Sequence, residues 1–306
     1  MKRTVLLLSA LFYAVSLLGQ TNEVVGKGST AMGFAVLPSD AASLGKAGAG
    51  LPSASWASFG DMGAVALASD GFAAGLSYSS LVPGKQQGIS AGFYLPLNGG
   101  LAVSAGAMLL KGEPYEEFNS LGSSIGEHTP SDMKINAGVS YKITDNLSAA
   151  AVFRFLRSDI ASNVNLTAFC ADLGASGVFG PVMASAGLRN LGPSVKDSGG
   201  SAYPLPSNIF VAGEYGLTLA ESSAVNVGLS SELYFSAGLS ASAGVEYAFK
   251  DMVFARAGYH LGNELLPSFL SAGIGLKFAG ASIDFAYLLA SETIGGSMIV
   301  GLGYSF

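Results

Sequence analysis

The chain contains two histidines, His128 and His260, and they are the first candidates for acid–base chemistry. Covalent or hydrolytic catalysis needs a nucleophile or an activated water within reach of a base. The two histidines lie in different parts of the sequence, and no serine or aspartate stands near them at the spacing of a known catalytic motif. A position in a solvated loop is the simpler interpretation. The sequence therefore predicts no catalytic residue and no enzymatic activity.

The sequence also lacks the residue spacing of a metal site or a phosphate-binding loop, and it lacks the second cysteine that a disulfide needs. The carboxylates between residues 112 and 132 are Glu113, Glu116, Glu117, Glu127 and Asp132. Carboxylate oxygens are suitable ligands for Ca²⁺, but the spacing of these residues matches no EF-hand pattern. A solvated cluster of charges is therefore favoured. The run Gly45–Gly50 lacks the Gly-Lys-Ser/Thr ending of a phosphate-binding loop. Cys170 is the only cysteine, which excludes an intrachain disulfide and a thiolate cage, and neither a metal nor a cofactor is predicted.

Targeting and composition together indicate a secreted protein of the Gram-negative outer membrane. Lys2 and Arg3 precede an apolar run from Val5 to Leu18, which predicts a signal peptide over residues 1–20. Half of the chain is hydrophobic and 12% is charged, against about 25% in soluble domains. No apolar run of about 20 residues follows Leu18, so a transmembrane helix is not expected. Of 15 Lys+Arg, 13 remain after cleavage against 21 Asp+Glu, and the net charge of about −8 argues against a nucleic-acid partner.

Beyond residue 70, apolar residues alternate with small or polar ones. In the last segments one face carries Ile283, Phe285, Tyr287, Leu289, Met298, Val300, Leu302, Tyr304 and Phe306, and the other carries Ser282, Asp284, Ala286, Ser297, Gly301, Gly303 and Ser305. This period of two is typical of β-strands with one apolar face. The opposite face has small residues and few charges, as the interior of a transmembrane β-barrel does. We therefore predict an all-β, antiparallel transmembrane barrel of about 14 strands over residues 71–306, surrounded by outer-membrane lipid.

The connections between these segments alternate between short and long. Short turns are expected at Thr144–Asn146, Phe179–Pro181 and Lys250–Asp251, and long loops over Gly112–Asp132, Asn190–Ser207 and Leu261–Ser268. Outer-membrane barrels have short periplasmic turns and longer outer loops, which this alternation matches. In the middle of the chain we expect separate strands at Asn163–Asp172 and Ala175–Arg189.

Aromatic residues close the predicted last strand. Tyr304 and Phe306 lie on its apolar face, and Phe306 is the last residue of the sequence. A terminal strand that ends in phenylalanine resembles the signal that bacterial outer-membrane barrels present to their assembly machinery. We therefore assign Tyr304 and Phe306 as a candidate assembly signal.

Residues 21–70 do not alternate and form a separate N-terminal segment. Asp40 can cap a short helical turn that includes Leu44, and the small residues Gly45 and Gly48 follow. We expect this segment, with Trp56, to fold as a plug into the mouth of the barrel. A disordered periplasmic tail is the alternative. It is disfavoured by the apolar residues Phe34, Val36, Leu37, Leu51, Trp56 and Phe59, because disordered segments seldom carry so many.

Charged residues within the predicted strands recur on the small-residue face. They are Lys134, Arg154, Glu214, Glu232, Glu246, Arg256, Lys277 and Asp284. A Lys or Arg facing lipid at the midplane would cost about 2–4 kcal/mol, so these side chains are expected to point into the lumen. Their mixed signs favour neutralising pairs that brace the lumen or hold the plug. A pathway for a solute is the alternative interpretation.

Several short motifs resemble the PorV/PorQ family of outer-membrane barrels. They are Leu188-Arg189-Asn190-Leu191-Gly192-Pro193 with Tyr203-Pro204-Leu205-Pro206-Ser207 at the centre, Arg256-Ala257-Gly258-Tyr259, Ser271–Leu276 and Ile283–Tyr287 near the end, and Leu37–Gly48 at the start. The resemblance spans most of the chain after residue 20. Where the family tends to show Trp-Asn-Pro-Ala, this chain has Trp56-Ala57-Ser58-Phe59, which leaves the shape and role of the plug open.

The resemblance implies a FadL-like barrel of fourteen strands with an N-terminal plug, in a bacterium of the Bacteroidota. Members of the family serve type IX secretion, where they bind the secretion translocon or receive exported proteins. We therefore expect an accessory or docking component of protein export, whose partners are a large translocon barrel or exported cargo proteins. A FadL-like channel for small hydrophobic or amphipathic ligands is the alternative. A secreted, soluble β-sandwich is a third option, which the low charge and Phe306 disfavour.

Overall fold

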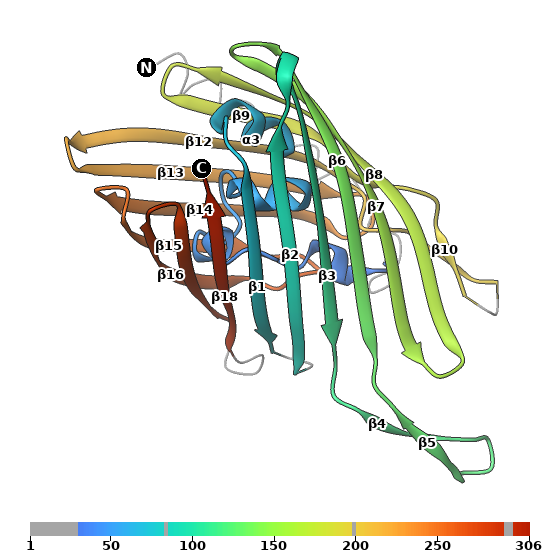
Figure 1. Cartoon of the computed structure of the whole chain (residues 1–306). Coiled ribbons are helices and arrows are strands. Elements are labelled where there is room, and N and C mark those ends of the chain that lie inside the picture. Colours follow the sequence, from blue (N-terminus) through green and yellow to red (C-terminus); the bar gives the residue numbers. More distant parts are fainter. Residues whose placement is uncertain (1–29, 83–84, 198–199, 291–295) are drawn as a thin grey trace.

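The computed structural model describes residues 30–82, 85–197, 200–290 and 296–306 (Figure 1). The predicted signal peptide, residues 1–20, and the first part of the N-terminal segment lie outside the described residues. The helices are η1 Gly33–Val36, α2 Ala41–Gly45, η2 Ala54–Phe59, α3 Met62–Ala68 and η3 Asn98–Gly100. None of the helices in these described ranges is long and apolar enough to cross a membrane.

A closed barrel of fourteen strands dominates the structure, and neighbouring strands are antiparallel throughout. The strands are β1 Ala73–Leu81, β2 Gln86–Pro96, β3 Leu101–Lys111, β6 Ser131–Thr144, β7 Leu147–Ala161, β8 Val164–Phe179, β9 Val182–Leu191, β12 Asn208–Ala220, β13 Ser223–Tyr234, β14 Gly238–Phe249, β15 Val253–Leu261, β16 Phe269–Phe278, β17 Ala281–Leu289 and β18 Gly296–Ser305. Their order around the barrel follows the chain. The predicted fold class is confirmed.

The first and last strands close the barrel. β1 pairs with β18 from Ala73 opposite Ser305 to Ser80 opposite Met298. The backbone N–H of Phe306 donates to the carbonyl of Phe72 at 3.1 Å. The first residues of β1 and the last residues of β18 therefore lie at the same end of the barrel, which we call the inner end. The expected short turns lie at this end, and the expected long loops lie at the opposite, outer end.

The two faces of the wall differ in the way that the alternation predicts. On the outside Ile274 is 63% exposed and Leu302 is 54% exposed, whereas the inward-facing Ala286 and Ile299 are fully buried. Small inward residues leave room inside the barrel, and large apolar residues cover its outer surface. An apolar outer band of this kind matches the hydrocarbon region of a bilayer.

One strand boundary predicted from the sequence is wrong. The break expected between Asp172 and Ala175 does not exist, because β8 continues from Val164 to Phe179. Glycine inside a strand weakens its intrinsic preference, which is why Gly174 resembled a turn. Cross-strand pairing overrides that weakness, since Gly174 lies opposite Gly187 of β9. The chain turns instead at residues 180–181.

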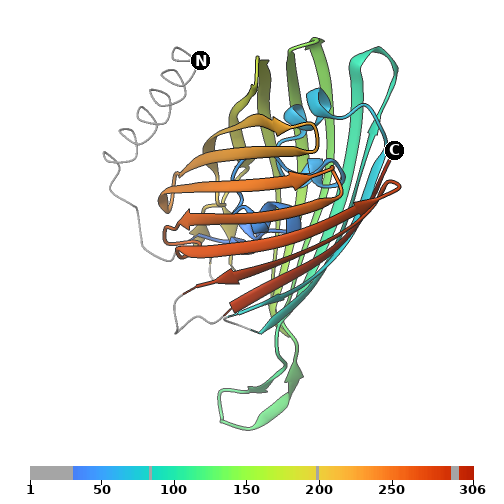
Figure 2. The same cartoon turned by 90° about the vertical axis from the view of Figure 1, so that its left-hand side faces the viewer.

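Two small ribbons at the outer end were not predicted. β4 Tyr115–Phe118 pairs with β5 Ser124–His128, and β10 Val195–Lys196 pairs with β11 Ala202–Tyr203. The β4–β5 hairpin extends well beyond the barrel wall (Figures 1 and 2). Strands this short give too few alternating residues for a sequence pattern to be recognised.

The described part of the N-terminal segment lies inside the barrel (Figures 1 and 2). Leu44 of α2 is in one buried cluster with Ala286 of β17 and Ile299 of β18. Met62 of α3 is in another with Val152 of β7. The apolar core of the molecule therefore lies between this segment and the inner face of the wall.

Wall glycines allow the segment to approach the strands closely. A Cβ atom at Gly244 or at Gly258 would lie 2.4 Å from backbone atoms of Lys46, and one at Gly228 would lie 2.8 Å from the nitrogen of Gly50. Real Cβ atoms do not come so close, so any larger residue here would displace the segment. These glycines explain part of the small-residue face seen in the sequence.

Candidate functional site: a divided cavity in the barrel lumen

Asp40 organises the N-terminal segment at the centre of the lumen. Its carboxylate caps helix α2 by accepting hydrogen bonds from the backbone N–H groups of Ala42 at 3.0 Å and Ser43 at 3.3 Å. The hydroxyls of Ser43 and Ser53 also donate to it, each at 2.7 Å. A capping aspartate satisfies helix N–H groups that have no partner within the helix. Here it also ties residue 53 to the helix.

A salt bridge clamps the segment to the wall. Nζ of Lys46 lies 2.9 Å from a carboxylate oxygen of Glu214 on β12, and both side chains are largely buried. The same oxygen accepts the backbone N–H of Leu51 at 3.2 Å. Gly48 and Gly50, with φ of +76° and +77°, turn the chain between these two contacts, a conformation that suits glycine. Glu214 therefore binds the residues on both sides of this turn, Lys46 before it and Leu51 after it.

Arg256 joins three strands of the wall beneath helix α2. Its guanidinium on β15 contacts Glu246 of β14 and Asp284 of β17, each at 2.6 Å. Hydrogen bonds between ionised partners are stronger than neutral ones. A Cβ atom at Gly45 would lie 3.2 Å from the Arg256 side chain, so the helix rests directly on this triad.

A second charged group lies on the other side of the lumen. Arg154 of β7 forms a buried ion pair with Asp172 of β8, and Nε of Arg154 lies 3.0 Å from the same carboxylate. Lys134 of β6 is buried, donates to the carbonyl of Ala35 at 3.1 Å, and lies 5.0 Å from the ring centroid of Phe59. Both contacts of Lys134 lead to the N-terminal segment.

Sequence reasoning missed two members of this charged set, Asp172 and Arg189. Arg189 of β9 lies 2.5 Å from Glu232 of β13, which also accepts the hydroxyl of Tyr234. Asp172 and Arg189 are the last residues of the predicted strands Asn163–Asp172 and Ala175–Arg189. At the end of a strand the alternation does not show whether a side chain points into the lumen or toward the lipid. With β8 extended to Phe179, Asp172 has the same parity as the buried Cys170, and the pattern would have identified it.

Not every predicted lumen residue is paired with the segment. Lys277 of β16 is exposed near the inner end and lines the inner cavity described below. Tyr304 and Phe306, the candidate assembly signal, are 49% and 76% exposed, and their ring centroids lie 5.8 Å apart. Both side chains are exposed at the inner end of the barrel, and Tyr304 is also among the residues that border the inner cavity.

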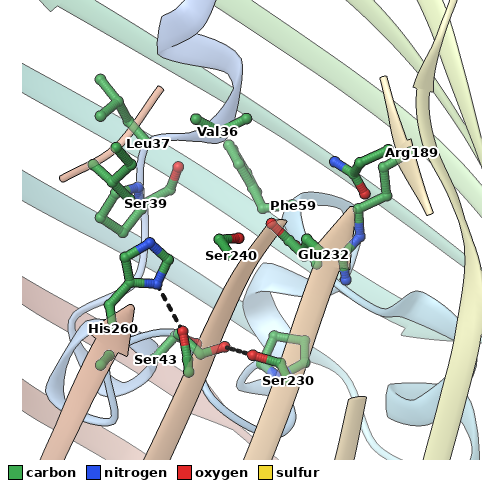
Figure 3. A pocket seen from close by; sticks show the side chains of 18 of the residues that line it. Val36, Leu37, Ser39, Ser43, Phe59, Arg189, Ser230, Glu232, Ser240 and His260 are labelled. Atoms are coloured by element: carbon green, nitrogen blue, oxygen red, sulfur yellow. Dashed lines mark hydrogen bonds and ion pairs between the residues drawn. The ribbon is translucent and has the colours of Figure 1, made fainter. Parts of the chain in front are cut away.

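A cavity of about 190 Å³ lies between the N-terminal segment and the outer half of the wall (Figure 3). Its apolar lining includes Val36, Leu37, Trp56, Phe59, Leu266 and Phe269, and its polar lining includes Arg189, Asn208, Glu232, Ser240 and His260. We call it the outer cavity. Ligand sites in proteins combine a mainly apolar lining with a few polar groups in this way.

His260 belongs to this cavity, and the expectation that it lies in a solvated loop is wrong. It is near the end of β15, is 8% exposed, and its Nδ1 lies 2.8 Å from the hydroxyl of Ser242. Its ring stacks on Phe269 with a centroid distance of 4.9 Å. The strand parity that His260 shares with Arg256 was the available signal for an inward position.

A second cavity of about 260 Å³ lies toward the inner end. Arg256, Lys277 and Asp284 line it, and we call it the inner cavity. Asp40 and Trp56 line both cavities. The N-terminal segment is therefore the partition between an outer and an inner compartment of one lumen.

The acidic loop lies far from both cavities, in and around the β4–β5 hairpin. Glu113 pairs with Lys85 at 2.9 Å, and Glu117 accepts the backbone N–H of Ser162 at 2.9 Å. Hydrogen bonds from Ser162 lower the pKa of Glu117. Within the part of the chain that the structure describes, no three His, Cys, Asp or Glu side chains are grouped as a metal site.

Several solved structures share this fold. The toluene transporter TodX of Pseudomonas putida matches with a TM-score of 0.61 and 14% identity over 88% of this chain and 98% of TodX. The toluene transporter TbuX of Ralstonia pickettii gives 0.57 and 14% over 87% and 98%. A FadL homologue of Pseudomonas aeruginosa gives 0.51 and 13% over 88% and 96%. At 13–14% sequence identity, the similarity to these structures shows a shared fold and nothing more.

Sequence comparison adds no closer relative. No family model matches the chain, and no curated protein matches it. The fold is therefore that of FadL-type outer-membrane barrels, and membership of the PorV/PorQ family stays a prediction.

Proposed function

We propose that the protein is an outer-membrane channel that admits a small hydrophobic or amphipathic molecule into its lumen. The observation that carries this proposal is the pair of cavities, outer and inner, on the two sides of one partition. The FadL-type fold supports it, since two of the similar structures are toluene transporters. This function was the alternative drawn from the sequence, and the lumen supports it better than a role in protein export.

The size and lining of the outer cavity fit a small molecule. Its volume of about 190 Å³ exceeds the roughly 150 Å³ of an engineered apolar cavity that binds benzene. Phe59 and Phe269 offer aromatic surfaces, and His260 and Asn208 offer polar atoms. Figure 3 shows Phe59 and His260 beside this cavity. A solute as large as a folded protein does not fit such a space.

Passage through the lumen requires the partition to move. Several polar contacts hold the segment to the wall, among them the salt bridge between Lys46 and Glu214 at 2.9 Å and the hydrogen bond from the hydroxyl of Ser77 to the carbonyl of Ser39 at 2.7 Å. A conducting state would exchange such contacts for contacts with water. In this proposal the segment acts as an internal gate.

Uptake by intact cells tests the function, because the lipopolysaccharide leaflet, unlike a simple phospholipid bilayer, resists hydrophobic solutes. A Gram-negative host producing the protein should take up labelled toluene faster than the same host with an empty vector. The Ser240→Trp variant, which fills the outer cavity, should lose that advantage while keeping the heat-modifiable gel mobility of a folded barrel. Equal uptake with and without the folded protein would refute the proposal.

A docking role in protein export is the second candidate, and the β4–β5 hairpin is the observation that favours it. Phe118, Leu121 and Ile125 on this hairpin are 59%, 88% and 59% exposed. Exposed apolar side chains on a projecting element are typical of contacts with another protein. Deleting residues 114–129 should then leave labelled toluene uptake intact but cause secreted proteins to be lost from the cell surface. An unchanged set of surface proteins would refute this second role.

A further inference from the structure

Two side chains form the boundary between the outer and the inner cavity. Among the described residues that line the cavities, Asp40 and Trp56 are the ones that line both. Asp40 is 6% exposed and Trp56 is 4% exposed, so the boundary is closely packed. A molecule that moves from one cavity to the other by the shortest route has to pass these two side chains.

Asp40 is the fixed side of this boundary. One carboxylate oxygen accepts the backbone N–H of Ala42, and the other accepts the backbone N–H of Ser43 and the hydroxyls of Ser43 and Ser53. A buried donor that loses its acceptor costs about 1–3 kcal/mol, and a displaced Asp40 would leave several donors without one. Asp40 therefore stays in place as long as helix α2 is folded.

Trp56 has a fixed backbone and a side chain that is held by packing. Its backbone N–H donates to the carbonyl of Ser53 at 2.9 Å, and the backbone N–H of Ser58 donates to the hydroxyl of Ser104 on β3 at 3.2 Å. The indole meets the ring of Phe59 edge to face at a centroid distance of 5.4 Å, and it lies over Gly75 of β1, where a Cβ atom would be 3.3 Å from it. The indole can therefore turn without breaking a hydrogen bond to any residue that the structure describes. It is the movable side of the boundary.

The volumes on the two sides indicate which solutes such a boundary would separate. An engineered cavity of roughly 150 Å³ holds benzene, so the outer cavity of about 190 Å³ holds one ring with a short substituent. Without the indole, this space would join the inner cavity of about 260 Å³ and would hold a two-ring molecule. We propose that Trp56 is the size filter of the channel, which passes one-ring solutes and rejects two-ring solutes. This inference rests on the proposed channel function and names the residue that determines its selectivity.

Two uncharged aromatic solutes of different size test the filter. A Gram-negative host that produces the protein is given labelled toluene or labelled naphthalene, and the rate measured with an empty vector is subtracted for each solute. We expect the parent protein to pass toluene about tenfold faster than naphthalene, a degree of discrimination that pockets reach by size alone. Trp56→Ala should reduce this ratio to about twofold or less, because the steric barrier is gone. An unchanged ratio in the folded variant would overturn the inference.

Phe34→Ala is the matched control for a general loosening of the N-terminal segment. Phe34 belongs to the same segment, is 7% exposed in an apolar cluster, and is not among the described residues that line either cavity. Both substitutions remove a buried aromatic ring, but only Trp56→Ala removes the boundary, so Phe34→Ala should keep the parent ratio. The same drop in both variants would attribute the effect to loosening and refute the filter. If Trp56→Ala does not fold, judged by heat-modifiable gel mobility, Trp56→Phe carries the test, and its smaller ring should give an intermediate ratio.

The outcome is separable from that of the channel itself. Uptake of toluene by the parent protein, with the same ratio of toluene to naphthalene in the Trp56 variant, would retain the channel and refute the filter. Uptake that appears only in the Trp56 variant would support Trp56 as the boundary and refute the channel function of the parent protein. Uptake at the vector level for both solutes in every folded form would refute both.

Discussion

At the scale of single residues, the lumen is built from charges that neutralise one another. Arg256 is the clearest case, because one guanidinium holds carboxylates from two other strands while helix α2 rests on it. Its side chain is 6% exposed, and those of Glu246 and Asp284 are 13% and 17% exposed. Burying a charge is tolerated when it is paired, and removing one partner leaves the others without compensation.

Replacing Arg256 should therefore be costly. Arg256→Gln leaves two carboxylates facing each other, and we expect a loss of about 3–5 kcal/mol in the free energy of unfolding. Urea unfolding in lipid vesicles, followed by Trp56 emission, measures it. Arg157→Gln is the control, because the Arg157–Asp159 pair is 47% and 31% exposed and such pairs contribute about 0–1 kcal/mol. Equal losses in the two variants would show that the triad does not brace the barrel.

At the scale of elements, the N-terminal segment and the β4–β5 hairpin make different kinds of contact. The segment is held inside by apolar clusters and by the Lys46–Glu214 salt bridge. The hairpin is held at its base by exposed polar contacts, including the hydroxyl of Tyr115 to the carbonyl of Ile160 at 2.7 Å. Segments with few buried contacts open most easily, so the two elements should respond to different perturbations.

The Lys46–Glu214 salt bridge should control the gate. Glu214→Gln removes the charge that holds Lys46, and we expect it to loosen the segment and raise ion conductance severalfold in planar bilayers. Lys46→Met should have a similar effect, and the double variant should add little because both act on one contact. Lys85→Met is the control, since Lys85 and Glu113 form an exposed pair at the outer end. Conductance unchanged from the parent protein in both gate variants would exclude this contact as a gate.

The hairpin should detach from the barrel at low pH. Because its pKa is lowered, Glu117 contributes to the contact with Ser162 above the pKa of an unfolded glutamate and loses it as the pH falls through the lowered pKa. A spin label at Leu121 should become more mobile between pH 7 and pH 3, and Glu117→Gln should show that mobility already at pH 7. A label at Phe235, on a different outer turn, should not change. Equal mobility at both pH values would contradict this contact.

At the scale of the whole molecule, the barrel was predictable and the cavity was not. Alternation is a local property, so Ile283 to Phe306 and similar segments gave the fold class and the number of strands. Within the barrel wall the local pattern misplaced one strand boundary, at Gly174, and outside the wall it missed the two short ribbons. The outer cavity depends on contacts such as Lys134 to Ala35, which join residues far apart in the sequence. No spacing motif encodes such contacts, so the cavity could not be predicted from the sequence. Arg189 was missed for a local reason, because it lies at the end of a misplaced strand, and His260 was misplaced although its strand parity indicated an inward position.

The most direct measurement is the anomalous X-ray signal of bromine in crystals of the protein soaked with 4-bromotoluene. The central claim is that small hydrophobic molecules occupy the lumen on both sides of the N-terminal segment. We predict bromine peaks in the outer cavity between Phe59 and Phe269, and in the inner cavity beside Trp56. Bromine only on the apolar outer surface, with none inside the barrel, would contradict the account.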